Sequence, residues 1–219
     1  MFVAVVPAYQ EARNIARVVA QLQEIVDCVV VVDDGSNDNT TEVARAAGAR
    51  VLRHRINRGQ GAALETGPEY AISIGADHVV DFDGDGQFDV VDIRPALVYL
   101  RSQAADLLLG SRFLGRAPAL PITKRYLILP LARWFHRCCY GVRHSDAHNG
   151  FRIYTARALE TIRIQQDRMA HATEIPAQAN RAKLSVVEFP VTVTYHRHGQ
   201  SGLGSLIILK DLFLRKFHF

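Results

Sequence analysis

Five aspartates gather in the middle of the chain with no lysine or arginine among them. Between His78 and Ile93 the charged residues are Asp81, Asp83, Asp85, Asp89 and Asp92. Two carboxylates one residue apart in an extended turn point to the same side, so Asp83 and Asp85 can share a hard divalent cation that also binds diphosphate oxygens. The alternative is that they only decorate a turn. Because like charges this close repel one another without a counter-ion, the cluster favours a functional metal site.

The positive charge gathers in the following segment. The formal net charge is +4, yet no Asp or Glu occurs between Leu107 and Ser145. The basic residues there are Arg112, Arg116, Lys124, Arg125, Arg133, Arg137 and Arg143. Such a stretch can bind phosphate, or it can be a solvated face that binds nothing. No recognisable nucleic-acid-binding module accompanies it, so we expect no nucleic acid partner.

Several other kinds of protein are disfavoured. The chain has neither the glycine fingerprint of a dinucleotide fold nor a Gly-Lys-Ser/Thr phosphate loop, and its histidines lack zinc-ligand spacing. Three cysteines, two of them adjacent, predict reduced thiols in the cytoplasm. The apolar start is broken by Pro7, and no run approaches the roughly 20 apolar residues of a membrane-spanning helix. If the protein meets a membrane, we expect it to lie on the surface or to be held there.

The elements that must position these residues alternate between strand and helix. Valine-rich apolar runs, typical of strands buried on both faces of a parallel sheet, cover residues 2–6, 28–32, 50–53 and 78–82. Helical periodicity covers residues 15–26, with Asn14 as its cap, then 40–47 and 62–74. Later strands are expected at 106–110, 151–154 and 185–195, and helices at 127–140 and 173–182. This pattern predicts one α/β domain.

Polar residues follow three of these strands, where ligands bind in open parallel sheets. The motifs, in chain order, are residues 6–11 (VPAYQE), 32–36 (VDDGS), 57–63 (NRGQGAA), 83–87 (DGDGQ), 110–113 (GSRF) and 149–152 (NGFR). Their order resembles that of family 2 glycosyltransferases, and most closely the dolichyl-phosphate mannose synthase and polyprenyl-phosphate glycosyltransferase branch. The likeness runs from Val3 to Ser201.

The resemblance implies a GT-A fold, with a Rossmann-like, mostly parallel sheet, and inversion at the anomeric carbon. It implies that a GDP- or UDP-linked sugar binds at Pro7, Ala8, Tyr9, Glu11, Val32, Asp34, Gly61, Asp83, Gly84, Asp85, Arg112 and Arg197. Asp83 would face the donor, and Mg²⁺ or Mn²⁺ would be held by Asp85 and Gln87, with Asp83 as a further candidate ligand. Catalytic roles would fall to Asp83, Asp85, Asp146 and Glu174.

The acceptor depends on the basic stretch. A hydroxyl acceptor requires a carboxylate base, for which Asp146 and then Glu174 are the candidates. A lipid phosphate is already an anion and needs cations instead, for which Lys124, Arg125 and Arg152 are the candidates. The leading hypothesis is therefore transfer of a hexose to polyprenyl phosphate at the cytoplasmic face of the membrane. The alternatives are transfer to a saccharide hydroxyl in cell-envelope synthesis and a non-catalytic nucleotide-binding module.

The closing motif departs from the mannose synthases. His196 and Gly202 occupy positions where those enzymes carry Arg and Lys, and Arg197 is a shifted substitute for the first. This departure leaves mannose as the sugar in question. We expect a catalytic domain over residues 1–202 and an amphipathic segment over 203–219 that contacts lipid or a membrane-anchored partner.

Overall fold

Valine-rich strands form the middle of the sheet, as their apolar runs predict. The computed structural model describes residues 1–84, 87–114, 145–146, 149–164 and 171–193. Within these ranges seven strands lie in the order β3-β2-β1-β4-β6-β5-β7. They are β1 Phe2–Ala8, β2 Cys28–Asp33, β3 Arg50–Arg53, β4 His78–Asp81, β5 Leu107–Ser111, β6 Arg152–Thr155 and β7 Val186–Pro190.

One strand interrupts an otherwise parallel sheet. β1 pairs in parallel with β2 and β4, β2 with β3, and β5 with β7. β6 runs antiparallel to both β4 and β5. As a result, the residues that lead into β6, around Gly150, lie at the edge where β4 and β5 end.

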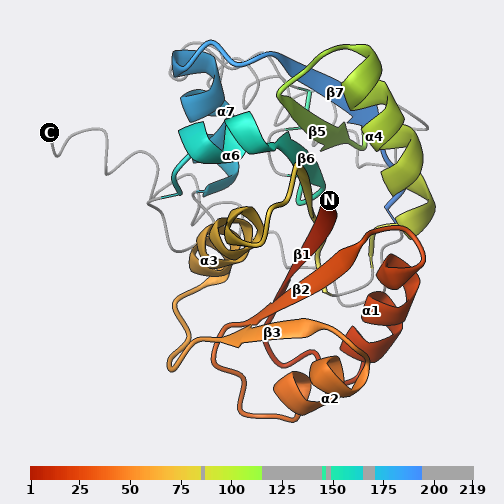
Figure 1. Cartoon of the computed structure of the whole chain (residues 1–219), viewed down its shortest axis with the longest axis vertical. Helices are drawn as coiled ribbons and strands as arrows, with labels where there is room; N and C mark the ends of the chain where they lie inside the picture. Colours follow the sequence, from red (N-terminus) through yellow and green to blue (C-terminus); the bar gives the residue numbers. More distant parts are fainter. Residues whose placement is uncertain (85–86, 115–144, 147–148, 165–170, 194–219) are drawn as a thin grey trace, which may run out of the picture.

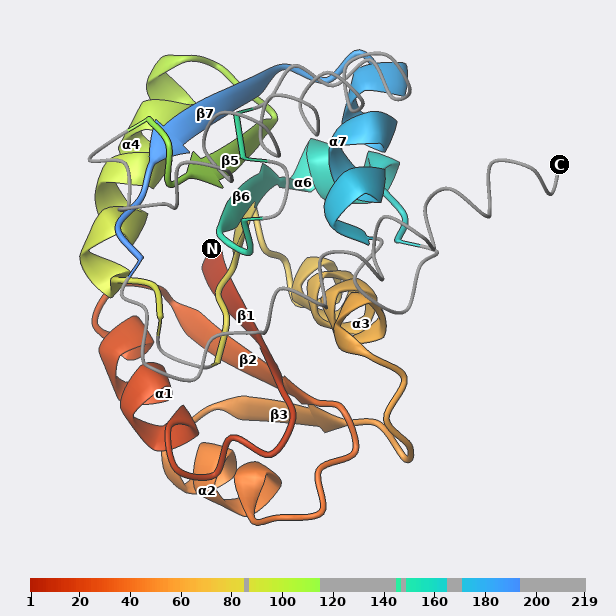
Figure 2. The same cartoon turned by 180° about the vertical axis from the view of Figure 1, so that it is seen from behind.

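Helices cover both faces of the sheet (Figures 1 and 2). They are α1 Ile15–Gln23, α2 Thr40–Ala46, α3 Gln60–Ser73, α4 Ile93–Ser102, α6 Ala156–Thr161 and α7 His171–Arg181, with a 3₁₀ turn η1 at Val90–Asp92. Apolar residues of α1, α2 and α4 pack on one face. Those of α3, α6 and α7 pack on the other. The three layers enclose two apolar cores, one on each side of the strands.

α3 crosses β1 at a close approach that requires glycine. A Cβ on Gly67 would lie 2.3 Å from Val5 Cγ1, so a larger residue there would push the helix away from the sheet. This contact sets the distance between the middle of α3 and the sheet.

The predicted α/β class and the first four strands are confirmed, with ends within two residues of those expected. Asn14 is the residue before α1, but its side chain does not cap the helix; its Nδ2 donates to Glu11 Oε2 at 2.9 Å instead. α4 and α6 were not predicted. The expected helix 127–140 and segment 203–219 lie outside the described residues. None of the described helices has the length and apolar character needed to cross a membrane.

Candidate active site

Asp83 lies directly after β4 and is held from two sides. Gln60 Nε2, at the start of α3, donates to Asp83 Oδ1 at 2.8 Å. Gly150, in the segment before β6, packs so closely that a Cβ there would lie 2.2 Å from Asp83 Oδ2. A Cβ on Gly84 would lie 3.1 Å from the carbonyl oxygen of Pro7. The predicted motifs at 6–11, 57–63, 83–87 and 149–152 therefore meet around one carboxylate.

A second carboxylate lies beneath this loop, inside the sheet. Asp81 of β4 is 1% exposed, and its register partner across to β6 is Arg152, which is 2% exposed. Tyr154 Oη donates to Asp81 Oδ2 at 2.8 Å. Burial raises the pKa of Asp81 to about 7, although Arg152 and Tyr154 act in the opposite direction. Asp81 Oδ1 and Arg152 Nη1 are buried without a hydrogen-bond partner.

The predicted donor residue Arg112 and the predicted base Asp146 bind each other. Arg112 Nε donates to Asp146 Oδ2 at 2.7 Å and Arg112 Nη2 to Oδ1 at 2.8 Å. The backbone N–H of Arg112 and Asn149 Nδ2 also donate to Oδ2, at 3.1 and 3.4 Å. Asp146 is 5% exposed. Charge-assisted bonds of this two-pronged kind are the strong ones in proteins.

A small network anchors this ion pair to the sheet. Ser111 Oγ, at the end of β5, lies 2.6 Å from Ser145 Oγ. Glu188 of β7 accepts from Ser145 N at 2.6 Å and from Ser145 Oγ at 2.7 Å. The residues beside Asp146 are thus tied to two neighbouring strands.

On the other side of the crevice, Asp34 shapes the loop that follows β3. Asp34 is 3% exposed. Its Oδ1 lies 2.7 Å from His54 Nδ1 and accepts from Arg58 N at 3.0 Å. Its Oδ2 accepts from Gly59 N at 2.6 Å. Its oxygens are thus occupied by the protein, and its expected contact with the ribose stays a prediction.

The remaining residues predicted to bind the nucleotide surround the carboxyl ends of β1 and β2. Tyr9 is 44% exposed and available to a ligand. Glu11 is oriented by two bonds, from its backbone N–H to Thr40 Oγ1 at 2.9 Å and from Asn14 to its carboxylate. Val32 is fully buried and packs in the core with α3, so its side chain positions the strand end.

Comparisons with known proteins agree with this geometry. Residues 3–163 match the family described as glycosyl transferase family 2. The chain belongs to this family. A UDP-N-acetylglucosamine–dolichyl-phosphate N-acetylglucosaminyltransferase of Methanococcus voltae is 27% identical, over 96% of this chain and 92% of that protein. Polyprenol monophosphomannose synthase of Mycolicibacterium smegmatis is 30% identical, over 95% of this chain and 83% of that protein.

The fold is that of GT-A glycosyltransferases. The crystal structure of glucosyl-3-phosphoglycerate synthase from Mycobacterium tuberculosis in complex with Mg²⁺ and UDP superposes with a TM-score of 0.68 at 21% identity. The match covers 94% of this chain and 74% of that one. The family match identifies the chain as a glycosyltransferase, and the structural match confirms the expected fold.

The other predicted catalytic residue of this glycosyltransferase, Glu174, lies in α7 on the opposite face of the sheet from α1. Its Oε1 accepts from Gln178 Nε2 at 3.1 Å. Its charge contributes to raising the pKa of Glu65 in α3. Its role as a base stays a prediction.

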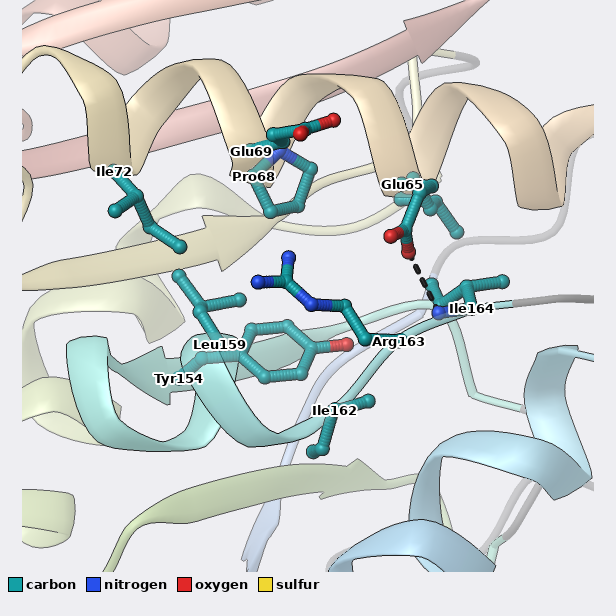
Figure 3. Close-up of a pocket in the computed structure, with 10 residues that line it drawn as sticks. Glu65, Pro68, Glu69, Ile72, Tyr154, Leu159, Ile162, Arg163 and Ile164 are labelled. Atoms are coloured by element: carbon teal, nitrogen blue, oxygen red, sulfur yellow. Dashed lines mark hydrogen bonds between the residues drawn. The ribbon is translucent and has the colours of Figure 1, made fainter.

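A shallow, mainly apolar pocket lies between α3 and the segment after α6 (Figure 3). Glu65 and Glu69 line it from α3, Tyr154 from β6, and Arg163 from the other side. Glu65 Oε2 accepts from Ile164 N at 2.6 Å. None of the predicted donor residues lines this pocket, so it is separate from the candidate active site.

Several predicted residues lie outside the described ranges: Asp85, Lys124, Arg125 and Arg197. Gln87 is described and half-buried. Among the described residues, no three His, Cys, Asp or Glu side chains are grouped to hold a metal. Because Asp85 is the central member of the expected set, that set stays a prediction.

Sequence reasoning missed the partners that hold these carboxylates. Gln60 and Tyr154 have no predicted role, because each acts through a neighbour that only the fold supplies. The histidines, His54 among them, are expected to be surface groups or to support other site residues, and His54 contacts Asp34. Arg152 was predicted to bind the acceptor, but its side chain is enclosed between strands beside Asp81. The sequence offered one signal for these contacts. Asp81, Asp83 and Asp85 are each two residues apart, as on one face of an extended chain, and this period continues the buried strand as far as Asp81.

Proposed function

We propose that this glycosyltransferase moves a hexose from a GDP- or UDP-linked sugar to a polyprenyl phosphate, with inversion and with Mg²⁺ or Mn²⁺. The observation that carries the proposal is the partly buried, two-pronged contact between Arg112 and Asp146. It occupies both oxygens of the carboxylate best placed by sequence to act as a base.

A phosphate acceptor removes the need for such a base. A hydroxyl must lose its proton during attack, and a carboxylate already bonded to Arg112 and Asn149 is poorly arranged to take it. A lipid phosphate attacks as an anion and requires only cations to position it. The acid-free stretch from Leu107 to Ser145 supplies such cations, and Lys124 and Arg125 remain the proposed contacts. The names of the two relatives, one a dolichyl-phosphate transferase, support the same acceptor class.

The donor binds in this proposal at the carboxyl ends of β1, β2 and β4. Tyr9 and Glu11 line the nucleoside side, and Arg112 and Arg197 approach the diphosphate. Asp83, Asp85 and Gln87 offer carboxylate and amide oxygens, which are the hard donors that Mg²⁺ and Mn²⁺ take. A bound metal would neutralise the charge on the departing nucleoside diphosphate. The Mg²⁺ and UDP in the structurally similar synthase support this assignment.

The reaction is a single displacement. An oxygen of the acceptor phosphate forms a bond to the anomeric carbon while the bond from that carbon to the diphosphate breaks, and nucleoside diphosphate leaves. Asp83, fixed by Gln60 and Gly150, holds its place at the donor sugar throughout. Preorganisation of this kind lowers the barrier because no side chain must rearrange as charge develops.

The location of the enzyme follows from the acceptor. A polyprenyl phosphate resides in the membrane, and nucleotide sugars are made in the cytoplasm, so we place the enzyme at the cytoplasmic face. The predicted segment 203–219 is proposed to contribute a surface contact there, alone or with a membrane-anchored partner.

The Asp146→Asn variant tests the acceptor class. Removing a general base costs about 100- to 10,000-fold in rate, so a base role predicts a loss of that size. If Asp146 only positions Arg112, the amide keeps one acceptor oxygen, and the rate of transfer to a short polyprenyl phosphate falls by about ten-fold or less. A larger loss, with the fold retained by circular dichroism, would instead support a hydroxyl acceptor. Nucleotide sugars are compared in the same assay with Mg²⁺ and with Mn²⁺.

A further inference from the structure

The loop between β3 and α3 presents an apolar side chain to water among arginines. We call residues 53–58, with the sequence RHRINR, the arginine loop. It projects from the body of the molecule between the two elements (Figures 1 and 2). Ile56 is 69% exposed, the largest value among the exposed large apolar residues of the described ranges. Single exposed apolar residues are common at protein surfaces, and Val98 and Val91 are 68% and 64% exposed, so the significance of Ile56 depends on the charges and the site beside it.

Contacts with the body of the protein hold the loop in the conformation that exposes Ile56. Asp34 binds both ends of the loop, through His54 Nδ1 at one end and the N–H groups of Arg58 and Gly59 at the other. In between, the backbone of Ile56 packs on Gly35, whose φ is +75° and whose Cβ, if present, would lie 2.8 Å from Ile56 C. The main chain at Ile56 therefore cannot turn its side chain inward without breaking these contacts.

The charged residues near Ile56 in the sequence have one sign. Between Glu42 and Glu65 the chain contains no Asp or Glu. The five arginines in that interval are Arg45, Arg50, Arg53, Arg55 and Arg58. Some of them serve the fold: Arg53 donates to Ser36 O at 2.8 Å, and Arg50 to Tyr70 Oη at 3.2 Å. Arg55 and Arg58, which flank Ile56, are exposed. A projecting apolar group between cations matches the chemistry of an anionic lipid surface.

The position of the loop adds to this match. The arginine loop leads directly into α3, whose first residue, Gln60, binds Asp83. Asp34, which pins the loop, lies at the carboxyl end of β2 on the same edge of the sheet. A lipid surface that meets the loop would thus lie beside the crevice where a membrane-borne acceptor must enter.

We propose that the arginine loop docks the enzyme on anionic membranes, with Ile56 inserted at the interface and Arg55 and Arg58 at the lipid phosphates. The proposal rests on the proposed function, since a lipid acceptor is what makes such docking useful. It assigns the contact to this loop, in addition to any contact made by segment 203–219.

Vesicle sedimentation of the full chain tests the proposal. The probes are vesicles of equal parts phosphatidylglycerol and phosphatidylcholine, and vesicles of phosphatidylcholine alone. We expect wild-type protein to bind the anionic vesicles. Ile56→Asp and Arg55→Glu should each weaken that binding by about ten-fold or more, because one loses interfacial burial and the other reverses a charge. Val98→Asp in α4 is the matched control, because Val98 is 68% exposed but lies on another part of the surface.

Three results would overturn the proposal. The first is wild-type protein that ignores anionic vesicles. The second is binding by Ile56→Asp equal to that of wild type or of Val98→Asp. The third is a loss of donor hydrolysis in Ile56→Asp, measured without lipid, that is as large as its loss of vesicle binding. That result would assign the loop to donor binding. Transfer to a short, water-soluble polyprenyl phosphate is measured in parallel. If wild-type protein transfers no sugar to this acceptor, the proposed function is contradicted. The vesicle result still tests the docking surface.

Discussion

The two halves of the sheet stabilise their buried carboxylates in different ways. In the half that we propose to bind the nucleotide, residues 1–84 (the donor half), Asp34 accepts from backbone N–H groups of the arginine loop and lies against His54. In the half that we propose to face the acceptor, residues 105–193 (the acceptor half), Asp146 is bound by the guanidinium of Arg112. At the junction of the halves, Asp81 of β4 faces Arg152 of β6 inside the sheet.

These two kinds of partner, backbone N–H groups and a guanidinium, give a buried carboxylate two different roles. A carboxylate bonded to backbone N–H groups determines the shape of a loop, and its loss leaves unpaired amides. A carboxylate paired with an arginine compensates the positive charge at the site. Its loss leaves that cation without a counter-charge. Substitutions in the two halves should therefore have different signatures.

The largest effect is expected at Asp83, where the halves meet. Asp83→Asn removes a charge that faces the donor and, in our proposal, the metal; such charges contribute several kcal/mol to the transition state, so transfer should fall by about 1,000-fold. Asp89→Asn is the matched control, because Asp89 belongs to the same acidic cluster but only caps η1, accepting from Val91 N at 3.1 Å. Steady-state transfer rates distinguish them. Similar losses in both variants would contradict a special role for Asp83.

The next effect concerns the charge pair inside the sheet. Arg152→Met leaves Asp81 buried without its counter-charge, and breaking a buried pair by removing one partner costs about 3 kcal/mol or more of unfolding free energy. The double variant Asp81→Asn, Arg152→Met should recover much of that loss. Urea unfolding of the three proteins measures both values. If the double variant is no more stable than Arg152→Met, the two side chains do not stabilise each other.

A smaller effect is expected at Asp34 in the donor half. Asp34→Ala leaves the N–H groups of Arg58 and Gly59 without their acceptor, a loss of about 2 kcal/mol. Asp34→Asn keeps one acceptor oxygen and should lose less. Hydrogen exchange at the amides of residues 58 and 59 reports whether the arginine loop opens. Unchanged protection in Asp34→Ala would show that the loop is held by other contacts.

The smallest effect concerns the pH dependence of stability. It arises at Glu65, where α3 contacts the acceptor half. Burial raises the pKa of Glu65 above its ordinary value of 4.5, with Glu69 and Glu174 adding to the rise and Ile164 N and Arg163 opposing it. The folded state therefore holds the proton more tightly than the unfolded state, so stability is fully present below pH 4.5 and declines as pH rises through the folded pKa. Glu65→Gln should flatten this decline in thermal unfolding across that range. A decline of unchanged slope would assign the titration to another group.

Much of the fold was readable from local pattern. The span of β3, residues 50–53, was predicted residue for residue, and the strand ends that carry Asp34 and Asp83 were placed correctly. The reason is that valine-rich runs and helix periodicity are local signals. α4 and α6 were missed, and the antiparallel course of β6 has no local signature, because strand direction depends on how distant segments return to the sheet.

The candidate site was readable as a list of residues but not as a set of contacts. Arg112 and Asp146 were both expected near the reaction centre, for different tasks, and they bind each other across 34 positions of sequence. Arg152 was expected to bind the acceptor phosphate, because its sequence neighbours do not reveal that β6 lies between β4 and β5. Contacts of this kind depend on how distant strands align in the sheet, which neighbouring residues in the sequence do not reveal.

The sequence by itself determined the α/β class, the family and the acidic loop at Asp83, because strand patterns and short motifs are properties of neighbouring residues. Only the tertiary structure decided which carboxylates already have partners: the arginine loop for Asp34, Tyr154 for Asp81, and Arg112 for Asp146. Each of these contacts joins segments that are far apart in the chain, and the chain must close its sheet before any of them exists.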